Sequence, residues 1–192
     1  MDNAHPGRPQ ATRPRRELRG AVAAVAGNVD YTYRRLSRRS SGAAALPRAV
    51  LPALHRPLPT VAVVCDTSGS MGEDELATAL AEVEALLARA GLRSTGVTVL
   101  SVDTEVHARS RVRRAGQVVL AGGGGTDMGA GLTAAAALRP RPDVVVVLTD
   151  GWTPWPDTPP RDLRVIVGLI GSDPEHVDVP PWARTVVIEP TG

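Results

Sequence analysis

The segment "DVVVVL", residues 143–148, constrains the fold of this chain more than any other feature. Its unbroken run of valine and leucine is typical of a β-strand that is covered on both faces, because a strand with one wet face alternates apolar and polar residues. The segment "VAVVC", residues 61–65, has the same character. Two such strands predict a mostly parallel sheet that is buried between layers of helices.

Helical periodicity between these strands supports this interpretation. In residues 73–90, large apolar residues from Leu76 to Leu87 recur at spacings of four, three and four, which predicts an amphipathic helix. Strands alternating with helices favour a doubly wound α/β fold, with a mostly parallel central sheet flanked by helices. The other predicted elements are a helix over 128–138, strands over 96–102, 163–170 and 184–188, and further elements around 106–112 and 117–121.

Charge is divided unevenly along the chain. Residues 1–56 contain 11 arginines and three acidic residues, whereas residues 57–192 contain 11 arginines and 17 acidic residues. The proline- and arginine-rich residues 1–16 are expected to form a disordered basic tail. Residues 17–56 are expected to form a basic extension with a short helix over 18–26, and residues 57–192 to form the α/β domain.

Composition excludes several classes of function. The chain has no lysine, so a Walker A lysine, a Schiff-base lysine and a lysine general base are excluded. Its single cysteine, Cys65, excludes an intrachain disulfide and a cysteine-cluster zinc site. No apolar run approaches the roughly 20 residues that span a bilayer, and the N-terminus has no secretory signal, so we expect a cytoplasmic protein without a membrane partner. The basic extension lacks a known nucleic-acid motif, so nucleic acid is not the expected partner.

Polar residues follow the predicted strands where ligands bind in open parallel sheets. Asp66, Ser68 and Ser70 follow the first strand, Thr126 lies in "GGGGTDMG", and Asp150 lies in "TDGW" after the valine-rich strand. Two carboxylates and three hydroxyls form a hard oxygen ligand set that suits Mg²⁺ or Mn²⁺. The first three residues alone would equally suit a turn and cap before the helix, and the other two favour a metal site.

The order and spacing of these five residues resemble the metal-ion-dependent adhesion site (MIDAS) of von Willebrand factor A (VWA) domains. The resemblance covers about residues 57–192 and implies a Rossmann-like sheet flanked by helices. It also implies that Ser68, Ser70 and Thr126 touch the metal, and that Asp66 and Asp150 bind it directly or through water. A glutamate or aspartate of a partner protein would then fill the open coordination position.

Several stretches also resemble the VWA-like C-terminal domain of bacterial metallopeptidase-family proteins. These stretches are "DYTYRRLSRR", "LPAL", "VCDTSGSM", "SVDTEV", "GGGGTDM" and "LTDGWTPWP". The N-terminal domain of that family carries a zinc-binding His-Glu-x-x-His motif, which this chain lacks, so peptidase activity is not carried over. Members of the group are often linked with MoxR-type AAA+ ATPases, and the resemblance therefore makes such an ATPase an expected partner.

Six further residues are expected to support the site or to contact a partner: Asp103, Gly125, Asp127, Gly151, Trp152 and Trp155. Some of them have a competing interpretation. Asp127 could instead cap the following helix, and Asp103 could instead belong to a turn at a strand end. Trp152 and Trp155 could either bind a partner, as tryptophan often does, or cover the edge of the sheet.

We therefore expect a non-enzymatic, metal-dependent interaction domain that acts as an adaptor or as part of a larger complex. A competing hypothesis is a metal-dependent hydrolase, because a bound cation could activate water. Against it, Ser68 stands where the Asp-x-Asp of a phosphatase needs its second aspartate and where a Gly-x-Ser-x-Gly elbow needs its first glycine. The chain could also be the non-catalytic C-terminal part of a metallopeptidase-like protein, or a structural domain with a vestigial site.

Overall fold

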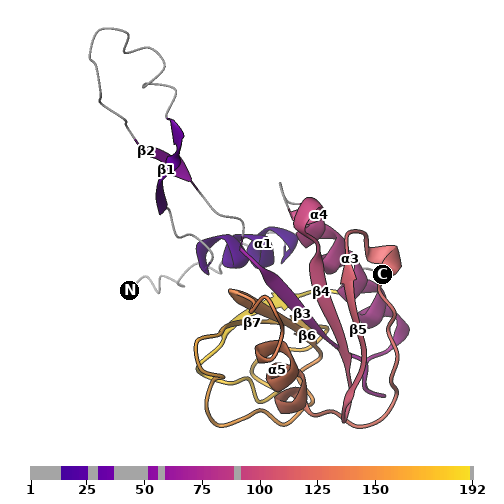
Figure 1. Ribbon diagram of the computed structural model, residues 1–192. Helices are drawn as coiled ribbons and strands as arrows, with labels where there is room; N and C mark the ends of the chain where they lie inside the picture. Colours follow the sequence, from indigo (N-terminus) through magenta and orange to yellow (C-terminus); the bar gives the residue numbers. More distant parts are fainter. Residues whose placement is uncertain (1–13, 26–29, 37–51, 56–58, 89–91, 191–192) are drawn as a thin grey trace, which may run out of the picture.

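A six-stranded sheet organises the protein (Figure 1). The computed structural model describes residues 14–25, 30–36, 52–55, 59–88 and 92–190. The strand order is β5-β4-β3-β6-β7-β8, in which β5 is antiparallel to β4 and every other neighbouring pair is parallel. The predicted doubly wound α/β fold is therefore confirmed. The strands are β3 (Val61–Asp66), β4 (Val97–Val102), β5 (Val106–Val112), β6 (Val144–Thr149), β7 (Arg164–Ile170) and β8 (Arg184–Ile188).

Helices cover both faces of the sheet because its central strands are apolar on both sides. The buried apolar side chains form two clusters, one under helix α3 (Glu73–Leu87), called the α3-side core, and one under helix α5 (Met128–Ala136), called the α5-side core. In β3, Val63 and Cys65 belong to the α3-side core, whereas Val64 belongs to the α5-side core. Every residue of β3 and β6 is buried. None of the helices in the described ranges is long and apolar enough to cross a bilayer. Two short helices in the described segments are α4 (Leu92–Thr95) and the 3-10 helix η1 (Ala115–Gln117).

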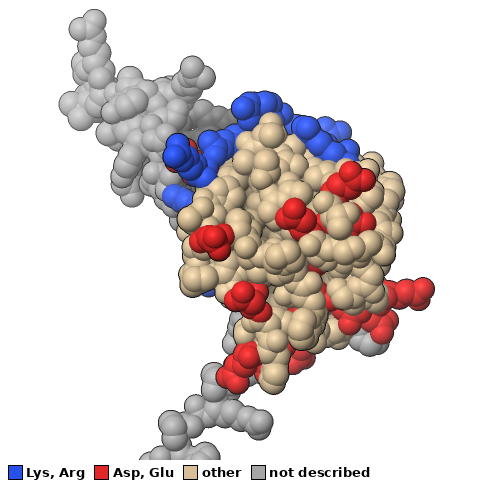
Figure 2. Space-filling model, turned by 90° about the horizontal axis from the view of Figure 1, so that it is seen from below, with Lys and Arg blue, Asp and Glu red and all other residues tan. Residues whose placement is uncertain are grey.

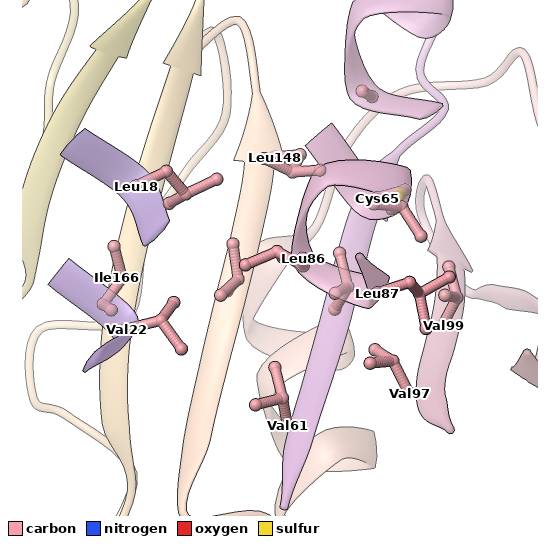
Figure 3. Close-up of a cluster of buried hydrophobic side chains, with 14 of the residues drawn as sticks. Leu18, Val22, Val61, Cys65, Leu86, Leu87, Val97, Val99, Leu148 and Ile166 are labelled. Atoms are coloured by element: carbon pink, nitrogen blue, oxygen red, sulfur yellow. The ribbon is translucent and has the colours of Figure 1, made fainter. Parts of the chain in front are cut away.

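Helix α1 (Pro14–Val25) packs into the α3-side core, although it precedes the predicted α/β domain in the sequence. Leu18 and Val22 are fully buried and lie near Ile166 of β7 (Figure 3). Strands β1 (Asp30–Leu36) and β2 (Pro52–His55) instead pair with each other in an antiparallel ribbon apart from the large sheet (Figure 1). Of the predicted basic tail, residues 1–13 lie outside the described residues.

The predicted element at residues 117–121 is not a strand. Residues 118–121 form neither helix nor strand. Side chains of Val118 and Leu120 pack against the α3-side core, which explains their alternating pattern. The carbonyl of Val119 accepts a hydrogen bond from the Ser101 hydroxyl at 2.6 Å, and the carbonyl of Ala121 accepts one from Thr67 at 2.8 Å, so side chains take the place of a neighbouring strand.

The order of the strands creates a switch point between β3 and β6. From β3 the chain continues to β4 and β5 on one side, then crosses to β6, β7 and β8 on the other. Cys65 of β3 lies opposite Leu148 of β6, so the residues that follow these two strands emerge side by side. Open parallel sheets bind ligands at such a point, beyond the carboxyl ends of the strands.

Candidate metal site

Asp66 ends β3 and is buried completely. Its Oδ2 accepts a 2.5 Å hydrogen bond from the Thr149 hydroxyl, and its Oδ1 accepts a 3.0 Å hydrogen bond from the Ser68 amide. Burial raises the pKa of this carboxyl above its ordinary value, and the negative charge of Asp150 adds to the rise, although the hydrogen bonds from Thr149 and Ser68 oppose it. A cation beside Asp66 would relieve this unfavourable burial of charge.

Ser68 and Ser70 place two hydroxyls together directly after Asp66. Their Oγ atoms are 3.0 Å apart. Ser68 is buried, whereas Ser70 is exposed. A turn, in which the Met71 amide donates to the Ser68 carbonyl at 3.1 Å, keeps this loop compact before α3 begins.

Asp150 follows β6 and brings the second carboxylate to the same edge. It is 5% exposed, and its Oδ1 accepts a 3.0 Å hydrogen bond from the Trp152 amide. At Gly151 the backbone has φ +89°, and a Cβ there would lie 2.7 Å from a Leu169 methyl carbon. Both the conformation and the space therefore require glycine.

The glycine-rich loop that carries Thr126 lies against the Ser68 loop. The Gly69 amide donates to the Gly124 carbonyl at 3.0 Å. Gly122 has φ +153° and approaches Thr67 so closely that a Cβ would lie 2.3 Å from its Oγ1. Thr126 is half-buried at the end of this loop. The structure thus brings the loop after β3 and the glycine-rich loop, which carry four of the five predicted ligands, to the same edge as the fifth, Asp150.

Asp103 joins the loops that surround the site. Its Oδ2 accepts from the Gly124 amide at 3.2 Å, and its Oδ1 accepts from the Glu105 amide at 3.1 Å and is 2.5 Å from Nε2 of His107. Its carbonyl accepts from the Asp127 amide at 2.7 Å. Burial by itself raises the pKa of Asp103, but the hydrogen bonds from Glu105, His107 and Gly124 outweigh burial and lower the pKa to about 2.

Asp127 has a local structural role. Its Oδ1 accepts a 3.1 Å hydrogen bond from the Ala130 amide, so Asp127 caps the N-terminus of α5. Its side chain is exposed. Gly125 is also exposed, and a Cβ there would lie 3.4 Å from the Thr104 methyl group. Both residues flank Thr126, and the cap by Asp127 fixes where the loop ends and α5 begins.

The two tryptophans after β6 have different environments. Trp152 is 64% exposed beside Asp150. Trp155 is half-buried and packs against the α5-side core. A hydrogen bond fixes the loop that follows Trp155, because Nε1 of Trp182 donates to the Pro156 carbonyl at 3.1 Å. Trp152 therefore has the exposure that a partner contact needs, whereas Trp155 covers the sheet.

Sequence reasoning missed Thr149 and His107. Thr149 is the last residue of β6 and directly precedes Asp150. Only this position, at the end of a strand next to a predicted ligand, could have indicated that its side chain reaches Asp66. His107 lies four residues after Asp103 on the antiparallel strand that follows it, so the β4–β5 turn brings the two together. Neither pairing follows from a sequence motif.

The chemistry of this edge depends on oxygen atoms. No group of three or more His, Cys, Asp and Glu side chains that could hold a metal occurs within the described segments, so any metal at this edge would need hydroxyl or water ligands besides its carboxylates. Two buried carboxylates with adjacent hydroxyls remain, and this donor set fits a hard cation of the magnesium type.

Comparison with known proteins agrees with this architecture. A family model described as "VWA-like domain (DUF2201)" matches residues 61–189, which include every strand of the large sheet and the whole candidate site. No curated protein and no solved structure matches the chain. VWA-like domains are generally non-catalytic interaction modules, which supports a protein-interaction or adaptor-type role. The chain belongs to the VWA-like domain family DUF2201.

Proposed function

We propose that this chain is a metal-dependent protein-interaction domain with a site of the MIDAS type. Ser68, Ser70 and Thr126 would bind Mg²⁺ or Mn²⁺ through their hydroxyls, while Asp66 and Asp150 would bind it directly or through water. The observation that carries the proposal is the burial of Asp66 next to the charge of Asp150. Two carboxylates at the ends of neighbouring strands need a counter-charge.

The role of the protein residues is to position oxygen atoms and to limit negative charge. Thr149 and the Ser68 amide orient both oxygens of Asp66, and the Trp152 amide orients Asp150. When bound, the cation supplies a Lewis-acidic position for a further oxygen ligand. Because three of the five protein ligands are neutral hydroxyls, the cation keeps enough positive charge to attract a carboxylate from a partner.

The surface around the site fits a partner that brings one carboxylate together with apolar or basic groups. In Figure 1, β4 runs toward the bottom of the molecule, so the view from below in Figure 2 shows the face at the carboxyl ends of the strands. This face carries scattered acidic side chains, whereas the basic side chains gather along one rim. An acidic surface would therefore be repelled except where the cation receives it. The exposed indole of Trp152 offers an aromatic contact beside that point. We propose a MoxR-type AAA+ ATPase as a candidate partner.

The test of metal binding is thermal unfolding of metal-stripped protein with added Mg²⁺, Mn²⁺ or Ca²⁺. A cation that binds only the native state raises the unfolding midpoint with its free concentration. We expect this rise with Mg²⁺ or Mn²⁺ in the wild type, its loss in the double variant Asp66→Ala/Ser68→Ala, and its retention in Asp157→Ala, which removes an exposed carboxylate. Equal rises in all three proteins would refute the assignment.

The test of partner binding uses the same proteins with a purified MoxR-type ATPase. The interaction should require Mg²⁺ or Mn²⁺ and should be lost in the double variant. Trp152→Ala should bind the metal normally but should weaken the complex, because the indole lies outside the ligand set. Metal-independent binding of the ATPase, or full binding by the double variant, would contradict the proposed mode.

A further inference from the structure

A polar cavity lies at the ends of the strands opposite to the candidate metal site. It has a volume of about 170 Å³ and lies where β3 and β4 begin. The cavity is far larger than the roughly 10–15 Å³ that is needed to hold one water. Its lining residues are Thr60, Val61, Gly96, Thr98, Arg109, Arg111, Leu138, Arg139 and Pro140.

Among the described residues that line it, three are arginines and none is acidic. Arg109 and Arg111 come from β5, and Arg139 follows the end of α5. Within the described residues, no carboxylate forms an ion pair with any of the three. The nearby Asp143 accepts a 2.7 Å hydrogen bond from the Thr60 amide through Oδ2, and it is not part of the lining. The cavity therefore gathers positive charge that no acidic residue in the described part of the chain pairs with.

Two of these guanidinium groups are held in place by backbone carbonyls. Nε and Nη2 of Arg111 donate to the Thr95 carbonyl at 2.9 and 2.5 Å. Nη1 of Arg139 donates to the carbonyls of Ala137 and Leu138 at 3.3 and 2.9 Å. Carbonyls fix the groups without neutralising them, and each guanidinium has five N–H donors, so donors remain on both for a ligand.

Protection of an edge strand explains only part of this arrangement. β5 is an edge strand, and charged side chains on an edge discourage pairing with another chain. That role accounts for Arg109 and Arg111. It does not account for Arg139, which comes from another element, or for the cavity that all three share.

We infer that this cavity binds a phosphate group. The forked donors of arginine match the tetrahedral oxygens of phosphate, and hydroxyl-bearing Thr60 and Thr98 add further donors at the wall. The phosphate is either free inorganic phosphate or a phosphorylated side chain of another protein. Binding at this edge is independent of the metal site, which occupies the other ends of the strands.

The experiment follows thermal unfolding and ³¹P NMR line width while inorganic phosphate is added to metal-stripped protein at constant ionic strength. Constant ionic strength removes general screening, and metal removal prevents phosphate from acting through the metal site. A second arm uses a short phosphoserine peptide and its unphosphorylated twin. The variants are Arg109→Gln and Arg139→Gln, with Arg184→Gln on β8 as the matched control.

We expect phosphate to raise the unfolding midpoint of the wild type and of Arg184→Gln. Each cavity variant should lose about tenfold or more in affinity, since one charge-assisted donor is removed. Tighter binding of the phosphoserine peptide than of phosphate identifies a protein ligand, and the reverse identifies free phosphate. Within the described residues, the Arg109 side chain donates no hydrogen bond, so Arg109→Gln is not expected to destabilise the fold. This variant therefore remains informative if Arg139→Gln is unstable. The inference is overturned if phosphate leaves the wild type unchanged or if all variants respond equally.

Discussion

The hydroxyl of Thr149 donates a 2.5 Å hydrogen bond to Oδ2 of Asp66 and so joins the ends of two neighbouring parallel strands. Both residues are fully buried. The same Thr149 oxygen accepts the Gly151 amide at 3.0 Å, so one hydroxyl fixes both the first carboxylate and the turn after the second. The geometry of the site therefore depends on a residue outside the five candidate ligands.

Thr149→Val should destabilise the protein while preserving side-chain shape. The change removes a hydrogen bond to a buried carboxylate and leaves the Gly151 amide without its acceptor, at a cost of about 1.5–3 kcal/mol. Urea unfolding of metal-stripped protein measures the difference. Thr149→Ser is the control, because it retains the hydroxyl and should keep most of the stability. A valine variant as stable as the serine variant would show that the hydrogen bond contributes nothing.

Asp103 should make the folded state sensitive to acid. Its pKa in the folded protein is about 2, below the ordinary value of 3.8, so the unfolded chain binds more protons between these values. The stabilisation is therefore complete above the ordinary value and is lost as the pH falls toward 2. The free energies of unfolding of the wild type and Asp103→Asn should converge as the pH is lowered from about 5 to about 2. Urea unfolding at a series of pH values tests this, and a constant difference would be the contrary result.

Gly122→Ala should disturb the glycine-rich loop. Its φ of +153° disfavours any side chain, and a Cβ would meet Thr67 Oγ1 at 2.3 Å. We expect a loss of about 1–3 kcal/mol in unfolding free energy, with weaker metal binding because the loop carries Thr126. Gly116→Ala is the matched control, since nothing lies within 4 Å of its Cβ. If both variants unfold at the same urea concentration, the loop is not held as described.

Leu18→Ala should show that α1 is part of the domain core. Leu18 is fully buried in the cluster that includes Ile166, so truncation should cost about 2–5 kcal/mol. Gly20→Ala on the same helix should instead stabilise by about 0.5–1 kcal/mol, because Gly20 is exposed and its Cβ would meet nothing within 4 Å. Chemical unfolding of the two variants measures both effects. A neutral Leu18→Ala would mean that α1 does not contribute to the core.

The sheet and the edge that carries the candidate site were predictable because strands buried on both faces consist of unbroken apolar runs. The valine-rich runs ending at Cys65 and Leu148 are typical of strands covered on both faces, and they form the paired central strands β3 and β6. Because parallel strands run in the same direction, the polar residues after each run had to meet at one edge. Asp66 and Asp150 therefore lie where the sequence pattern indicated.

The remaining features depend on contacts between distant residues that leave no periodic pattern. Val118 and Leu120 alternate like a strand, but they do so because they pack on the core beneath a segment without ladder hydrogen bonds. The bond between His107 and Asp103 depends on the β4–β5 turn. The packing of α1 likewise required the positions of β7 and β8, which lie far along the chain.

The most direct test of the central claim is a titration of metal-stripped protein with Mn²⁺, followed by electron paramagnetic resonance of the free ion. Wild-type protein should remove one Mn²⁺ per chain from solution, and Mg²⁺ should displace it. Asp157→Ala should behave like the wild type, whereas Asp66→Ala/Ser68→Ala should leave the Mn²⁺ signal unchanged. If the wild type fails to bind Mn²⁺, or if the double variant binds it equally well, the edge between β3 and β6 is not a metal site.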